Sequence, residues 1–273
     1  MTTEETKKES TTGLFQEEFT ATKMSNAEIV NRRRVINGFD DGLMQVSPLK
    51  HPWAYDIFNT MIKNTWVPQE VPMQLDVNMW NDPSALTEQE RNVYERSLAF
   101  VSNLDGLQTN NLACNIIRHI TSPEIVLAIT RQTYEEALHV QSYATLVEAL
   151  ALDPESVYGL YRTDQDLYEK NQTVLASVSK IADPQFKTGT FETDQMFLES
   201  CIGNIILEGI YFYSAFLIFY VLSTSVFSNF IMTDISVLMQ LANFRASHSL
   251  GVKLLNAERT ILLNSRGIMS SSV

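Results

Sequence analysis

The sequence predicts an all-α protein built as a bundle of long helices. Turn-forming residues are scarce, with 10 glycines and 8 prolines among 273 residues. Apolar residues recur every three or four positions over long stretches, whereas the alternation typical of strands is nowhere sustained. Hydrophobic residues make up 45% of the chain and charged residues 19%, which excludes a wholly disordered protein and allows one large core.

Helix start and stop signals place the first elements in order. Apolar residues at helical spacing predict a helix over residues 51–66. Pro68 ends it, because the residue before a proline avoids the helical region. Thr87 and Glu90 have the spacing of a capping box, which predicts a second helix running past Leu112. The apolar residues of the first helix are Trp53, Ile57, Met61 and Ile62.

Two more helices and a break follow. Ser122 is an N-cap residue followed by proline at the first helical position, and this predicts a helix reaching about Leu152. The pair at 153–154, Asp-Pro, predicts the next helix, which extends into the 170s. A polar stretch over residues 183–193 then separates this part from the most apolar segment of the chain.

That apolar segment, residues 201–222, is long enough to span a membrane. Asn204 and Glu208 in its interior argue against a membrane span, because a carboxylate at the middle of a bilayer is costly. Lys and Arg do not flank it closely, so the usual topology signal is missing. We therefore expect a helix buried on all faces of a bundle and no membrane. The N-terminal residues carry no export or import signal, which predicts a cytoplasmic protein.

Charge and cysteine content exclude other classes. The formal net charge of -12 and a sequence pI near 4.8 argue against an electrostatic nucleic-acid binder. Two cysteines allow neither a disulfide framework nor a thiolate zinc cluster. The charge balance changes after residue 222, because residues 223–273 hold two acids against four basic residues. We expect a disordered segment over residues 1–25, a helical domain over 26–222 and a divergent tail over 223–273.

Acidic residues interrupt three long apolar helices. Asp105 and Glu208 each occupy a position where the pattern calls for a hydrophobic residue, and Glu136 and His139 project from one helix face at i, i+3 spacing. Burying several unpaired carboxylates would be prohibitive without a cation, and a pair of iron or manganese ions suits these ligands. Each residue alone has a simpler interpretation: a solvated surface pair, a neutral buried acid, or a local bend at Asp105.

At these residues the chain resembles the small, radical-generating subunit of class I ribonucleotide reductase. The resemblance covers about residues 27–222. It rests on LAFVSNLDGLQTNNL around Asp105, YEEALHVQSY with Glu136 and His139, NIILEGIYFYSAF with Glu208, and WVPQEV with Trp66. The resemblance implies a ferritin-like bundle with a dinuclear iron site, alternatively Mn/Fe or Mn/Mn.

The resemblance also implies roles for other residues and partners. Tyr143, four residues after His139, would carry the tyrosyl radical, and Phe212 and Phe216 would sheath it. Trp66 would pass an electron to the metal site. The chain would form a homodimer and would start ribonucleotide reduction in a separate large catalytic subunit. From the residues alone, Tyr143 and Trp66 are equally compatible with ordinary core positions.

The C-terminal part departs from the family pattern. The family has a second Glu-x-x-His preceded by an Asp that links Trp66 to the metal site, and the comparable spacing here is Arg245-Ala-Ser-His248. Arginine is a fixed cation and cannot act as a ligand. The acidic tail that docks on the large subunit is also missing. Two alternatives therefore stay open: a diverged di-metal oxidase of the same fold, and an inactive fragment of an interrupted or frame-altered gene.

Overall fold

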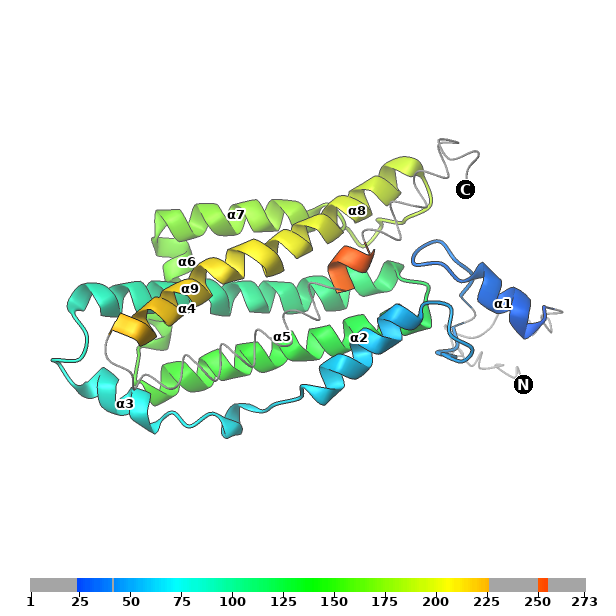
Figure 1. Ribbon diagram of the computed structural model, residues 1–273. Coiled ribbons are helices and arrows are strands. Elements are labelled where there is room, and N and C mark those ends of the chain that lie inside the picture. The colour runs from blue at the N-terminus through cyan, green and yellow to red at the C-terminus, as the bar shows by residue number, and fades with distance from the viewer. Residues whose placement is uncertain (1–23, 41, 226–249, 255–273) are drawn as a thin grey trace, which may run out of the picture.

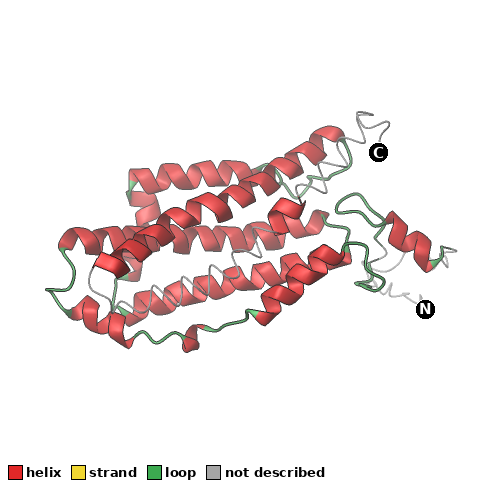
Figure 2. Ribbon diagram, viewed as in Figure 1, coloured by secondary structure: helices red, strands yellow, loops and turns green. Residues whose placement is uncertain are grey.

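The computed structural model describes residues 24–40, 42–225 and 250–254, and this part of the chain consists of helices joined by loops, without named strands (Figures 1 and 2). The longest helices, α4, α5 and the continuous α8–α9, lie lengthwise side by side, and α2 packs along α5. The helices are α1 (Asn26–Arg32), α2 (Pro52–Lys63), α3 (Gln74–Asn81), α4 (Glu88–Asn110), α5 (Pro123–Ala149), α6 (Pro154–Thr163), α7 (Gln165–Ser179), α8 (Phe191–Ile206) and α9 (Phe212–Ser225). The predicted all-α class is confirmed.

The start of α4 forms as its sequence predicts. Thr87 accepts a hydrogen bond from the backbone N–H of Glu90, and the Glu90 carboxylate accepts from the backbone N–H of Thr87. This reciprocal capping box satisfies two backbone donors that the first helical turn leaves open. The helix then continues past Asn110 into the π-helical turn η2 (Asn111–Ile116) and the 3-10 turn η3 (Ile117–His119).

The start of α5 differs in its chemistry from the prediction. Ser122 is the N-cap residue, but its hydroxyl makes no capping bond with the helix backbone. Instead it donates to the Glu124 carboxylate at 2.7 Å and contacts the His51 ring at 2.8 Å. Glu124 is fully buried and also accepts from the backbone N–H of Lys50 at 2.6 Å. The residues before α2 are thereby fastened to the first turn of α5.

The segment predicted as one helix from residue 154 into the 170s is two helices, α6 and α7. Asp164 separates them, because it ends α6 in an extended conformation and its carboxylate accepts from the backbone N–H of Leu167 at the start of α7. Two short helices, α1 and α3, lie in stretches for which the sequence analysis named no element. Of the apolar residues at helical spacing in α2, Ile57 and Met61 are buried, whereas Ile62 is exposed.

The apolar segment forms a continuous helical rod of α8, the π-helical turn η4 (Leu207–Tyr211) and α9. By length and composition this rod could cross a membrane. The expectation that it is buried on all faces is wrong for the part of the chain that the structure describes, since Ile210 and Leu217 are 63% and 61% exposed. The rod packs on α4 and α7 through one face, and its opposite face lies outside these contacts.

Two hydrophobic clusters form the core along the bundle. One surrounds Tyr143, Phe212 and Phe216, and the other surrounds Met61, Ile129 and Phe197. Residues 250–254 pack into the second cluster, where a side chain at Gly251 would collide with Ile205. Residues 223–225, at the end of α9, are the other described part of the 223–273 tail, while Arg245, His248 and nearly all of residues 1–25 lie outside the described residues.

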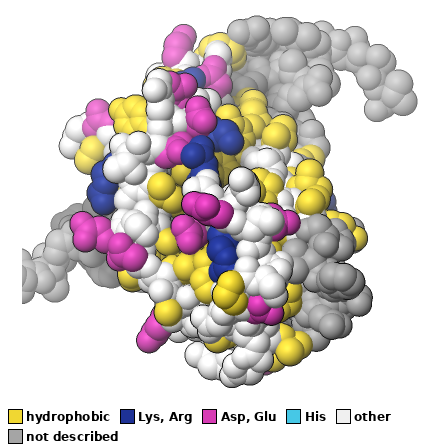
Figure 3. All heavy atoms as spheres, turned by 90° about the vertical axis from the view of Figure 1, so that its left-hand side faces the viewer, with side chains coloured by type: hydrophobic (Ala, Val, Ile, Leu, Met, Phe, Trp, Pro, Cys, Tyr) yellow, Lys and Arg dark blue, Asp and Glu magenta, His cyan; other side chains and the backbone are white. Residues whose placement is uncertain are grey.

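The surface that Figure 3 shows is one end of the bundle, with acidic, basic and apolar side chains intermingled. Among the ion pairs of the described residues, Arg96 of α4 pairs with Asp164 and Asp166. No extended basic patch appears on this face, in line with the acidic composition.

Candidate metal centre

Three of the four predicted ligands converge inside the bundle. His139 Nδ1 lies 3.1 Å from Glu136 Oε2 and 3.8 Å from Asp105 Oδ2. The ligand atoms of all three lie within 4.8 Å of one another, and the side chains are buried. Glu136 and His139 share one face of α5 because they are three residues apart, and α4 supplies Asp105 from the facing helix.

Glu208 joins this cluster from the third helix. It lies in the π-helical turn η4, and its carboxyl group shares a hydrogen bond with that of Glu136. Gln108 Nε2 donates to Glu208 Oε1 at 2.8 Å, and Gln132 Nε2 donates to the same oxygen at 3.3 Å. A π turn widens the helix by one residue and is frequent at functional sites. Two glutamines on neighbouring helices therefore fix the position of the third carboxylate.

The sequence analysis missed these glutamines. Gln108 follows Asp105 by three residues, and Gln132 precedes Glu136 by four, so both lie on the faces that carry the acids. Asn204, one turn before Glu208, accepts a second hydrogen bond from the Gln108 amide. Their amide side chains at otherwise apolar helix positions could have indicated them, because buried polar groups require hydrogen-bond partners.

The electrostatics of the cluster call for a cation. Burial raises the pKa of the Asp105 carboxyl, and the neighbouring Glu136 and Glu208 carboxylates raise it further. Burial also raises the pKa of Glu208 and raises that of Glu136 to about 8. Burial lowers the pKa of His139, which favours the neutral imidazole that binds metals. Carboxylate oxygens and a neutral imidazole fit iron or manganese, and a bound metal ion would offset the repulsion among the acids.

The predicted radical residue lies next to this cluster. Tyr143 is buried one turn beyond His139 on α5, and its hydroxyl shares a hydrogen bond with the Asp105 carboxylate. Phe212 and Phe216 belong to the same hydrophobic cluster as Tyr143, with their ring centroids 6.2 Å apart. The structure thus brings the tyrosine, its carboxylate neighbour and the two phenylalanines together.

Trp66 lies on the other side of His139. Its ring is 2% exposed and stacks on the imidazole with centroids 6.1 Å apart and an interplanar angle of 27°. Among the described residues, neither Trp66 Nε1 nor His139 Nε2 has a hydrogen-bond partner. The Asp that links these rings in the family has no match before Arg245 in the sequence, and that stretch lies outside the described residues.

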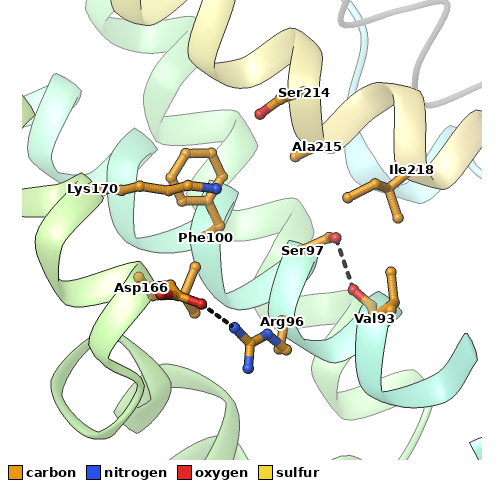
Figure 4. A pocket seen from close by; sticks show the side chains of 10 residues that line it. Val93, Arg96, Ser97, Phe100, Asp166, Lys170, Ser214, Ala215 and Ile218 are labelled. Atoms are coloured by element: carbon orange, nitrogen blue, oxygen red, sulfur yellow. Dashed lines mark hydrogen bonds and ion pairs between the residues drawn. The ribbon is translucent and has the colours of Figure 1, made fainter. Parts of the chain in front are cut away.

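A separate surface pocket of about 240 Å³ lies between α4, α7 and α9 (Figure 4). Phe100 and Leu167 contribute apolar walls, Lys170 lies over the Phe100 ring, and Arg96 pairs with Asp166 at the rim. None of the predicted metal ligands lines it. The pocket is thus distinct from the carboxylate cluster, and no sequence motif indicated it.

Fold and site together define a class: a helical-bundle protein whose buried carboxylates and histidine are suited to a transition metal. The sequence pattern of one family, ribonucleotide reductase small chain, matches residues 43–241. The chain belongs to this family. The match begins later and ends later than the range of about 27–222 on which the resemblance rested.

Individual relatives agree with this assignment. The β subunits of ribonucleoside-diphosphate reductase from Chlamydia pneumoniae and Aquifex aeolicus are each 32% identical, over 68% and 70% of this chain. These alignments cover 54% and 27% of the relatives, so the chain spans about half or less of their length.

Solved structures extend the comparison to the fold. The ribonucleotide reductase R2 subunit from Clostridium botulinum superposes with a TM-score of 0.75 at 28% identity, covering 87% of this chain and 71% of that one. The dimanganese(II)-NrdF of Streptococcus sanguinis superposes with a TM-score of 0.61 at 14% identity, covering 82% of this chain and 83% of that one, and supports the fold alone. The predicted ferritin-like bundle is confirmed.

Proposed function

We propose that this chain acts as a small subunit of ribonucleoside-diphosphate reductase, in which a dinuclear metal site generates a tyrosyl radical on Tyr143. The observation that carries the proposal is the convergence of Asp105, Glu136 and His139 within 4.8 Å, beside a buried tyrosine bonded to Asp105. The radical would start ribonucleotide reduction in a separate large subunit. Association as a homodimer and a cytoplasmic location are part of the same proposal.

The residues of the chain have distinct tasks in this proposal. Asp105, Glu136, His139 and Glu208 would hold the metal ions, which together with an oxidant such as oxygen would supply a one-electron oxidation. On oxidation, Tyr143 would lose its phenolic proton, which the hydrogen-bonded Asp105 carboxylate is placed to accept.

The surroundings protect the product of this step. Phe212 and Phe216 pack in the same cluster as Tyr143 and exclude water from it. Trp66, stacked on His139, would deliver one further electron to the metal site.

The proposed metal pair is diiron, Mn/Fe or Mn/Mn, because carboxylate and imidazole ligands suit all three. Four ligands lie in the described part of the chain, and Arg245 to His248 lie outside it. A second candidate, a diverged or inactive chain with a weakened site, is favoured by the sequence, in which Arg245 occupies the position of the family's second ligand glutamate.

The test combines metal stoichiometry with electron paramagnetic resonance. Chain loaded anaerobically with Fe(II) or Mn(II) and then exposed to oxygen or hydrogen peroxide should hold about two metals and show a tyrosyl signal that is absent in Tyr143→Phe. Tyr94→Phe is a matched control, because Tyr94 is also buried in the same cluster but lies on α4. Fewer than one metal per chain and no signal would support the inactive alternative.

A further inference from the structure

A buried ion pair on α5 lies next to the predicted metal ligands. Arg131 and Glu135 are one helical turn apart, 8% and 1% exposed, and form a direct ion pair. Glu135 immediately precedes the ligand Glu136, so the two acids point in directions about 100° apart around the helix. One acid faces the metal cluster, and the other holds a guanidinium.

The guanidinium reaches across to the end of α2. Arg131 Nη2 donates to the side-chain oxygen of Thr65 at 3.0 Å and to the backbone carbonyl of Met61 at 3.3 Å. The Thr65 hydroxyl in turn donates to the Ile62 carbonyl at 2.6 Å. Helix α2 ends at Lys63, and Thr65 is held just past this end by its backbone N–H, which donates to the Ile62 carbonyl at 3.1 Å, together with these side-chain contacts.

Thr65 is followed directly by Trp66, whose ring stacks on His139. Trp66 packs with Val71 and Leu138 in a small cluster of its own. Apolar contact alone is non-directional and tolerates sliding, whereas hydrogen bonds from a planar guanidinium fix both distance and angle. The orientation of the Trp66 ring therefore depends on how its neighbour Thr65 is anchored.

We propose that Arg131, braced by Glu135, is a positioning residue that fixes Trp66 against His139 by gripping Thr65 and the last turn of α2. A buried ion pair alone is weak evidence for stability, because desolvation offsets most of its attraction. Here its geometric effect is to join two helices at the residue next to the stacked ring. The importance of Trp66 for the reaction rests on the proposed function. The hydrogen bonds of Arg131 to Thr65 and the last turn of α2 are independent of that function.

The decisive variant is Thr65→Val, which keeps the size of the side chain and removes the oxygen that Arg131 grips. It is made in a chain in which Trp53 and Trp80 are replaced by phenylalanine, so that fluorescence reports Trp66 alone. We expect the emission to shift to longer wavelength and the acrylamide quenching constant to rise at least twofold in the metal-free chain.

The matched control is Thr60→Val. Thr60 also lies in α2, and its hydroxyl donates to the Asp56 carbonyl at 2.8 Å, four residues earlier. It should leave the fluorescence of Trp66 unchanged, with thermal unfolding of both variants showing that each is folded. A second variant, Arg131→Gln, should reproduce the effect of Thr65→Val from the other side of the contact.

Equal quenching in Thr65→Val and Thr60→Val would overturn the positioning role, whether or not the chain forms a radical. In the metal-loaded chain, Thr65→Val should lower the radical yield severalfold with unchanged Co(II) affinity. A loosened Trp66 with an unaltered radical yield would refute the electron-donor role of Trp66 and leave the grip established. The two readouts thus separate the positioning role from the proposed function.

Discussion

Replacing Glu136 by glutamine should stabilise the metal-free chain at alkaline pH and leave it almost unchanged at acid pH. Burial raises the pKa of Glu136 from 4.5 to about 8. Between these values the folded chain retains a proton that the unfolded chain has lost. The free energy of unfolding therefore falls as the pH rises through this window.

The magnitude follows from the width of the window. Each pH unit over which one group is protonated in only one state is equivalent to about 1.36 kcal/mol, so Glu136 alone lowers the stability by up to roughly 5 kcal/mol at pH 8.5 relative to pH 4.5. This is a large share of the ~5–15 kcal/mol that stabilises a typical domain. Glu136→Gln removes the contribution of Glu136 and should make the decline shallower, while the raised pKa values of Asp105 and Glu208 keep part of it.

Urea unfolding of the metal-free chain at pH 5 and at pH 8.5 measures the effect. Glu148→Gln is the control, because Glu148 lies on the exposed side of the same helix. Adding Mn(II) at about 100 times its dissociation constant should return about 2.7 kcal/mol to the parent chain and little to Glu136→Gln. Parallel pH profiles for the parent chain and Glu136→Gln would refute the burial of an unneutralised carboxylate at this position.

Three further variants test other parts of the structure. Gln108→Leu removes a donor from Glu208 and should weaken Co(II) binding about tenfold to a hundredfold, as measured by titration of the metal-free chain. Thr87→Ala removes the capping box of α4 and should lower the free energy of urea unfolding by about 1 kcal/mol. Phe212→Ala opens the apolar pocket and should cost about 3–5 kcal/mol in urea unfolding, with faster decay of any radical signal from Tyr143.

Each of these variants has a contradicting outcome. Unchanged Co(II) affinity in Gln108→Leu, with Gln141→Leu on the exposed side of α5 as reference, would show that Glu208 needs no such support. A loss far above 1 kcal/mol in Thr87→Ala would indicate a role beyond capping. Equal radical lifetimes in Phe212→Ala and Phe219→Ala, two buried phenylalanines of one cluster, would remove the specific sheath.

Local rules explain why the sequence predicted most of the helices. The capping box at Thr87 acts within one turn, so its residues specify the start of α4 without help from the rest of the fold. The break at Asp164 was missed because an aspartate fits equally well at a helix start and on a solvated helix face. Burial of the α8–α9 rod on all faces was wrong because composition shows how apolar a helix is but not which neighbours cover it.

The acidic residues and the histidine of the candidate site could be predicted from the sequence, whereas its neutral amides could not. Asp105 and Glu208 stand out because an acid on an apolar face is costly unless something compensates it. Gln108 and Gln132 did not stand out, because a buried amide carries no charge. Their role depends on a hydrogen bond to Glu208, which lies 100 and 76 residues further along the chain, respectively. The hydrogen bond from Arg131 to Thr65 likewise joins α5 to the end of α2, and no local sequence pattern predicts that these two elements meet.

The π-helical turn at η4 separates two demands on one helix. Glu208 must point at the carboxylates of α4 and α5, while Phe212 must pack beside Tyr143 one turn later. In a regular α-helix these two directions are locked together at 100° per residue. The wider π turn changes the angle between the two side chains, so Glu208 can point at the carboxylates without a rotation of Phe212 away from Tyr143. One extra residue in the turn thus uncouples the direction of the Glu208 carboxylate from the packing of Phe212 against the Tyr143 cluster.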